Sequence, residues 1–285
     1  DIEVALQNPA MQGPFYGLNY TDHYRIGGVK ISLDGSPQGK TAWLSKPYYK
    51  VPEGEKPDYA GYPAFPTAKV DDLITQAWGH GWQVQAHANG DAAIDQLIHA
   101  VSAAEAKYPD KHLVPVLIHG QTLRKDQVGE LRRLGIFPSL FPMHTYYWGD
   151  WHRDSVLGPE RAENISPTQW VLDAGMVFTS HHDAPVVFPD SMRVLDATVN
   201  RVTRSGRVLG PDQRVSPAIA LKAITLWAAR QYGEESSKGS IEVGKRADLV
   251  LLSDNPMTIE RSQLHTIKVL QTIKDGVVVF EAEPK

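Results

Sequence analysis

The sequence contains no cysteine among its 285 residues. This absence excludes disulfide bridges, thiolate nucleophiles and zinc sites built on cysteine. No apolar run approaches the roughly eighteen residues that a membrane-spanning helix needs. Charge of neither sign dominates, because 29 Lys and Arg residues stand against 33 Asp and Glu residues. We therefore expect no nucleic-acid partner and no membrane partner, and a small-molecule substrate remains the natural ligand class.

Several catalytic fingerprints are also missing. The chain has no G-x-S-x-G nucleophile elbow, no P-loop, no G-x-G-x-x-G dinucleotide motif and no His-Glu-x-x-His pair. These absences exclude the sequence patterns of serine hydrolases of the α/β-hydrolase type, nucleotide-binding P-loop enzymes and the commonest zinc proteases.

What is present is an alternation of short apolar runs with stretches of helical periodicity. This alternation predicts an α/β fold with a parallel sheet and helical crossovers. The expected strands are 28–33, 81–87, 114–119, 135–140 and 176–180, and the expected helices are 69–79, 91–108, 125–134, 167–174 and 217–232.

Residue spacing points to an eight-stranded TIM barrel. His87 and His119 end consecutive expected strands and lie 32 residues apart, against about 31 residues for one β/α unit of such a barrel. Asp183 follows His119 by 64 residues, or two units. Lys30 precedes His87 by 57 residues, one unit enlarged by the Pro- and Tyr-rich segment 43–66, which is either functional or a solvated loop. All four residues then belong to the barrel face that carries chemistry.

The last fifty residues differ in pattern. Segments 239–252, 267–273 and 276–280 are predicted strands, and an Asp-Gly pair between the last two is a strong hairpin signal. We therefore expect two domains: a barrel portion over 1–235 and a small β appendage over 236–285.

Two histidines at equivalent positions of adjacent strands predict a metal site. The imidazoles of His87 and His119 would point across one pocket, where zinc favours nitrogen ligands and an open position for water. Asp183 is either a metal ligand and general base or a turn cap before a proline. Since neighbours on a strand face opposite ways, His181 and His182 cannot both face the pocket. We keep His182 as a substrate-side group and leave His181 open.

An aromatic-rich segment follows the next expected strand. His144 precedes residues 146–151, which include Trp148 and form a predicted loop. Such a loop either lines a substrate pocket for an apolar or aromatic group or packs against the barrel rim. Lys30 is likewise either a solvated residue on the outside of the fold or a functional group within it.

Six motifs in order resemble the amidohydrolase superfamily, closest to the family-3 group of N-substituted formamide deformylase-like enzymes. The resemblance covers about 27–280 and implies a metal-dependent hydrolase on a distorted β/α barrel. The motifs are VKISLDGS at 29–36, QAHANGDA at 85–92, LIHG at 117–120, LGPERA at 157–162, SHHDAPV at 180–186 and GSIEVGKRADLV at 239–250.

The resemblance also implies residue roles. His87 and His119 would bind a divalent metal, most simply one or two zinc ions, at the ends of strands five and six. Asp183, after strand eight, would bind metal and act as general base. Lys30, on strand four, resembles a carboxylated bridging lysine, and His144 a substrate-side histidine.

Two departures from the family pattern matter. His181 and His182 replace the usual Gly-Ser pair, and the His-x-His pair of strand one is not found in this sequence. The chain therefore resembles the C-terminal portion of the family, strands four to eight with part of a β-sandwich. Because five strands cannot close this barrel, we expect the N-terminal half in a further segment or second chain, or a swapped homo-oligomer.

The expected activity is hydrolysis of a C–N bond in an amide, formamide or cyclic amide by metal-activated water. Two alternatives stay open. One is deamination or ester hydrolysis on the same site, because a fold does not fix its substrate. The other is a non-catalytic ligand-binding scaffold, which the missing His-x-His pair favours.

Overall fold

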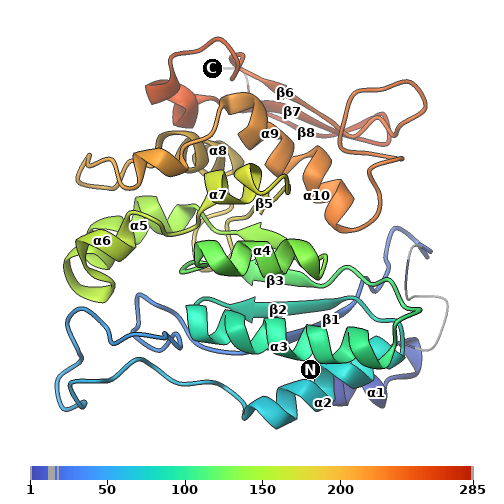
Figure 1. Cartoon of the computed structure of the whole chain (residues 1–285). Coiled ribbons are helices and arrows are strands. Elements are labelled where there is room, and N and C mark those ends of the chain that lie inside the picture. Colours follow the sequence, from blue (N-terminus) through green and yellow to red (C-terminus); the bar gives the residue numbers. More distant parts are fainter. Residues whose placement is uncertain (1, 12–16, 18, 284–285) are drawn as a thin grey trace.

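The computed structural model describes residues 2–11, 17 and 19–283. At its centre is a five-stranded sheet in the order β1-β2-β3-β4-β5, with every neighbouring pair parallel (Figure 1). Each strand overlaps one that the sequence predicts, so the α/β class with a parallel sheet is confirmed. The strands are β1 (Val29–Ser32), β2 (Val84–Ala88), β3 (Val116–His119), β4 (Phe137–Leu140) and β5 (Thr179–Ser180).

Helices join successive strands, as parallel pairing requires. Four of the expected helices agree with the observed ones to within two residues at each end: α2 (Thr67–Gly79), α3 (Asp91–Lys107), α4 (Lys125–Arg133) and α7 (Thr168–Asp173). The expected helix 217–232 is instead two helices, α9 (Pro217–Ile224) and α10 (Leu226–Gln231). The break falls at Thr225, whose φ is −130° and whose hydroxyl donates to the Leu221 carbonyl over 2.7 Å.

The predicted loop over 146–151 is wrong, because this segment is helical. It forms α5 (Met143–Trp151), which begins directly after Pro142 and continues into a π-helix, η2 (His152–Val156). Aromatic residues have modest helix propensity, and here tertiary packing overrides it. Tyr146, Tyr147 and Trp148 pack against a buried cluster of Phe141, Met143, Val187, Val194 and Ala197.

A further helix, α8 (Ser191–Asn200), was not expected from the sequence. Two of the cluster's members, Val194 and Ala197, belong to it, so α8 completes the packing of α5. The remaining short helical elements are α1 (Ile2–Leu6), η1 (Pro9–Met11), α6 (Gly158–Ala162), η3 (Pro211–Gln213) and η4 (Arg261–Thr266).

The two faces of the parallel sheet carry different side chains. Ile31, Ala86 and Leu117 are aligned across β1, β2 and β3 and belong to the main hydrophobic core, which α2, α3 and α4 share. Because side chains alternate along a strand, the adjacent register row faces away from these helices. That row runs Ser32, His87, Ile118, Ser139, Thr179. The site residue on β2 therefore lies on the face opposite the helical layer.

The C-terminal strands form a separate antiparallel sheet, ordered β6-β7-β8. They are β6 (Leu249–Leu252), β7 (Val269–Lys274) and β8 (Val277–Glu281), with the expected hairpin between the last two. All residues of β8 are exposed. In the described part of the chain, no helix is long and apolar enough to cross a membrane.

Candidate functional site

Three histidines form one hydrogen-bonded row at the carboxyl edge of the parallel sheet. His87 comes from β2, His119 ends β3, and His181 directly follows β5. His119 Nε2 lies 3.0 Å from His87 Nδ1, and His181 Nε2 lies 3.1 Å from His119 Nδ1. The structure thus brings together the two histidines that the sequence paired and adds a third that the sequence left open.

The groups at the ends of the row allow its hydrogen bonds to run in either direction. His87 Nε2 lies 3.2 Å from the Asn89 side-chain nitrogen, a donor, and 3.1 Å from the Gly35 carbonyl oxygen, an acceptor. If His87 Nε2 donates to this carbonyl oxygen, His87 Nδ1 must accept from His119, and His119 Nδ1 must accept from His181. The Ser139 hydroxyl, 3.1 Å from His181 Nδ1, then donates the last bond. All three rings are satisfied in their neutral form.

Burial keeps these rings neutral. It lowers the pKa of His119 far below its usual range, and the neighbouring His181, His87 and Lys30 charges lower it further. Burial likewise lowers the pKa of His181 to about 3, with smaller contributions from His182, Lys30 and His87. Neutral imidazole is the form that binds a metal ion.

Two of the predicted site residues have strained backbones. The φ of His119 is +77° and that of Asp183 is +53°. A non-glycine residue in this region costs about 1–3 kcal/mol, which the surrounding structure must offset. For His119, the strain accompanies the turn out of β3 that sets its ring between His87 and His181.

Asp34 is a buried carboxylate next to the histidine row, close to His87. Its side chain is 0% exposed and lies 3.4 Å from His87 Nε2. Its carboxylate accepts backbone N–H groups from Trp43, Asn89 and Gly90 at 2.7–3.0 Å. It therefore fastens the start of segment 43–66 to the end of β2. The sequence analysis missed this residue, although it stands within the motif at 29–36.

Lys30 pairs with Gln85, two register rows before His87, and so lies on the same face of the sheet as His87. Its side chain is exposed, since Lys30 alternates with the buried Val29 and Ile31 along β1. Its charge contributes to lowering the pKa values of His119 and His181, so it lies within electrostatic reach of both rings.

The three polar residues that follow β5 have different surroundings. His181 joins the row, whereas the buried Nδ1 atom of His182 has no hydrogen-bond partner. Asp183 is half-buried, and its backbone carbonyl accepts from Val186 at 2.8 Å. Among the described residues, no three His, Cys, Asp or Glu side chains are grouped as a metal site. The rings hydrogen-bond to one another, and the Asp183 carboxylate stands outside their row.

His144 and Trp148 form a second layer around the row. His144, on α5, is 2% exposed, and its ring centre lies 6.3 Å from that of His119 and 5.9 Å from that of Trp148. Its Nδ1 atom is buried without a partner, and burial holds the pKa of its ring well below the usual value. An unpaired buried nitrogen facing a histidine row is suited to bind a polar ligand atom.

The donor set fits a divalent metal ion such as zinc. Neutral imidazole nitrogens are preferred zinc ligands, and His87 and His119 direct nitrogens at one another across 3.0 Å. The gaps between rings are now filled by hydrogen bonds, which a metal would replace. His87 and His119 would hold such an ion, with His181 and Asp183 as the adjoining donors.

Comparison with known proteins gives a consistent result. Residues 5–280 match the family model described as the amidohydrolase family, Amidohydro_3. The N-substituted formamide deformylase of Arthrobacter pascens is 29% identical over 262 residues, covering 90% of this chain and 46% of that protein. An uncharacterized metal-dependent hydrolase from Pyrococcus horikoshii superposes with a TM-score of 0.76 at 24% identity, over 92% of this chain and 50% of the other.

A second uncharacterized metal-dependent hydrolase, from Pyrococcus furiosus, has a TM-score of 0.73 and 27% identity, over 90% of this chain and 50% of the other. The chain spans about half the length of these relatives. The five-stranded parallel sheet with its histidine motifs therefore corresponds to about half of such a hydrolase. On the match over 5–280, this chain belongs to the amidohydrolase family, in its family-3 group.

Proposed function

We propose that this chain carries part of the active site of a metal-dependent hydrolase that cleaves the C–N bond of an amide, formamide or cyclic amide. The observation that carries the proposal is the row of His87, His119 and His181 at one edge of the sheet. The relationship to a deformylase and to metal-dependent hydrolases supports the reaction class.

The proposed fold is strands four to eight of a (β/α)8 barrel, β1 to β5 here, followed by part of a β-sandwich formed by β6–β8. The parallel order of the five strands and their unit-like spacing support this assignment. The proposed domain limits are 1–235 and 236–285. Lys30 and Ser32 are exposed on the inward face of the edge strand β1. Further strands, from another segment or a second chain, would pack against this edge.

In this proposal, His87, His119 and Asp183 would hold the ion, and Lys30, once carboxylated, would be a further ligand. A bound zinc ion supplies Lewis acidity, which polarises the substrate carbonyl and lowers the pKa of water toward 7. The remaining chemistry belongs to the chain. Asp183 accepts the proton of the attacking water and later delivers it to the leaving nitrogen.

The substrate side of the site is assigned to His144, His182 and Trp148. The unpaired Nδ1 atoms of His144 and His182 are free to hydrogen-bond the carbonyl oxygen as negative charge develops on it. The indole of Trp148 lies against His144 and offers an apolar wall for the acyl or amine substituent.

Amide hydrolysis by the zinc-loaded protein tests this function. N-substituted formamides are the first substrates to assay, with product amine as the readout. Asp183→Asn should lower kcat by about a hundredfold to ten-thousandfold while bound zinc is retained, because loss of a general base costs that much.

Asp110→Asn is the matched control, since Asp110 is exposed and remote from the histidines. It should turn over at the unsubstituted rate. Turnover by Asp183→Asn at that same rate would remove Asp183 as the base.

A further inference from the structure

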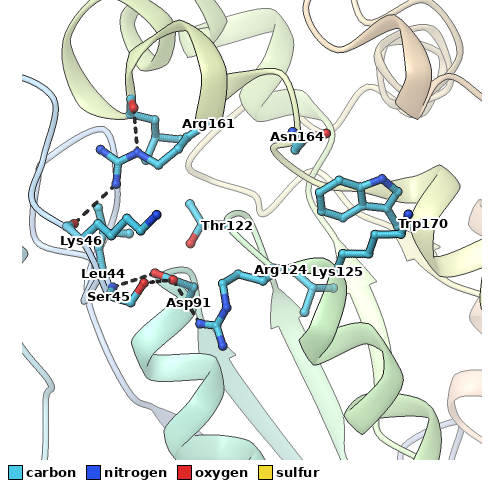
Figure 2. Close-up of a pocket in the computed structure, with 12 residues that line it drawn as sticks. Leu44, Ser45, Lys46, Asp91, Thr122, Arg124, Lys125, Arg161, Asn164 and Trp170 are labelled. Carbon is cyan, nitrogen blue, oxygen red and sulfur yellow. Dashed lines mark hydrogen bonds and ion pairs between the residues drawn. The ribbon is translucent and has the colours of Figure 1, made fainter.

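A pocket lies beside the histidine row but does not include it. It has a volume of about 210 Å³ and is bounded by segment 44–46, the starts of α3 and α4, and α6 with its following turn (Figure 2). An engineered cavity of about 150 Å³ takes up benzene, so this pocket has room for a ring with one substituent.

The pocket is rich in positive charge. Its lining holds Lys46, Arg124, Lys125 and Arg161 against a single carboxylate, Asp91. That carboxylate is already engaged, because it accepts from the backbone and hydroxyl of Ser45 and from Arg124. The lining residues alone therefore carry more positive than negative charge, before Asp95 and Asp126 beside Arg124 are counted.

The four cations are not equally available. Arg124 is neutralised by Asp91, Asp95 and Asp126, each within 3.1 Å. Arg161 instead donates to the carbonyl oxygens of Leu157, Lys46 and Pro47.

No carboxylate of the described residues lies within ion-pair distance of Arg161, Lys46 or Lys125. Burial lowers the pKa of Arg161, a sign that its charge is only partly solvated. Arg161, Lys46 and Lys125 are thus the lining cations without an ion-pair contact in the described part of the chain, although the charges of Asp91 and Glu160 partly offset the effect of burial on the pKa of Arg161.

The other walls are apolar. Leu44 and Leu157 are buried, and the Trp170 indole stands across the pocket from Lys46 and Arg161 (Figure 2). Lys46 and Arg161 on one side and the indole on the other suit a ligand with a negative group at one end and a flat apolar group at the other.

We infer that this pocket binds a small organic carboxylate carrying an aromatic or other flat apolar group, with the carboxylate between Lys46 and Arg161 and the ring against Trp170. The site is separate from the proposed metal site and does not depend on the proposed hydrolysis. It does lie next to the row. Thr122 in its lining bonds the Asn89 carbonyl, and the Asn89 side chain lies 3.2 Å from His87 Nε2.

Binding of phenylacetate to the metal-free protein, measured by isothermal titration calorimetry, tests the inference. We expect a Kd at or below about 1 mM, which corresponds to a free energy near −4 kcal/mol. The uncharged analogue 2-phenylethanol should bind at least about tenfold more weakly, since it has no negative charge to pair with Lys46 and Arg161. Acetate, which lacks the ring, should also bind at least about tenfold more weakly.

Lys46→Met should weaken phenylacetate binding by about fivefold to tenfold, and Lys125→Met should weaken it by a smaller factor. Lys50→Met is the matched control, because Lys50 is an exposed lysine of the same segment outside the pocket. Its Kd should equal that of the unsubstituted protein.

Phenylacetate and 2-phenylethanol binding alike, an unchanged Kd in Lys46→Met, or no heat of binding up to about 10 mM would each overturn the inference. His119→Asn separates this site from the metal site. It should abolish hydrolysis without changing the Kd for phenylacetate, so either proposal can fail without the other.

Discussion

At the scale of single residues, Asp34 links the candidate site to its scaffold. One buried carboxylate holds three backbone N–H groups, from Trp43, Asn89 and Gly90, and also approaches His87. A Cβ atom at Gly90 would come within 1.8 Å of the Trp43 carbonyl oxygen, so glycine is required where these segments meet. Strand end and loop are therefore fixed as one unit.

Asp34→Asn should lower the free energy of unfolding by about 2 kcal/mol, because an amide accepts fewer of these hydrogen bonds and carries no charge. Urea unfolding followed by circular dichroism measures the change. Asp110→Asn, at an exposed site, should stay within about 0.5 kcal/mol of the unsubstituted protein. An equally small change in Asp34→Asn would show that the carboxylate does not fasten the loop.

The histidine row was predicted only in part from the sequence. The sequence placed His87 and His119 at adjacent strand ends, and their rings are in contact. The alternation rule stated that only one of His181 and His182 faces the row, but not which one. That choice depends on β5, which is only two residues long, and on the bond from the His181 amide to the Leu140 carbonyl. The sequence predicts a strand over 176–180, but the bond that orients His181 is made with β4, which is distant in the sequence.

At the scale of elements, α5 and α8 were both absent from the sequence prediction, for different reasons. α5 has little helical periodicity and forms through packing around Phe141 and Val194. α8 has an Asp190 cap and an apolar face that includes Val194 and Leu195, so its signal was present in the sequence and was overlooked.

The pocket lined by Lys46 and Arg161 could not be predicted either, because it forms where segment 44–46 meets α4 and α6. Strands β1 to β4 were accessible because short runs mark them, in which apolar residues either alternate with polar ones, as in β2, or follow one another, as in β3.

The first turn of α8 depends on a side-chain cap. The Asp190 carboxylate accepts the backbone N–H groups of Met192 at 3.0 Å and Arg193 at 3.1 Å. Asp190→Ala should therefore lower the free energy of unfolding by about 1 kcal/mol. Ser191→Ala, one residue later and exposed, is the control and should change it little. If both variants unfold at the same urea concentration as the parent, the cap contributes nothing measurable.

At the scale of the whole molecule, buried neutral histidines make stability depend on pH. His152 is 0% exposed, and burial lowers its pKa from 6.5 to about 3. A basic group whose pKa is lower in the folded state than in the unfolded state stabilises the fold at pH values above its unfolded pKa. This stabilisation is lost as the pH falls toward the pKa of the folded state. The stability contributed by neutral, buried His152 is therefore lost between about pH 6.5 and about pH 3.

We expect the free energy of unfolding to fall between about pH 7 and about pH 5, by up to about 1.4 kcal/mol per pH unit for each such histidine. His152→Gln should lower this slope, because the folded and unfolded states would then differ by about one fewer bound proton. His112→Gln should leave it unchanged, since His112 is exposed. A slope that is the same in both variants would contradict a neutral, buried His152.

The central claim is that the histidine row binds a divalent metal ion, and metal retention tests it most directly. The protein is loaded with zinc, dialysed, gel-filtered and analysed by inductively coupled plasma mass spectrometry. We predict about one or two zinc ions per chain, a loss of that zinc in His119→Asn, and full retention in His112→Asn. No retained zinc, or equal retention in both variants, would contradict a metal site on this row.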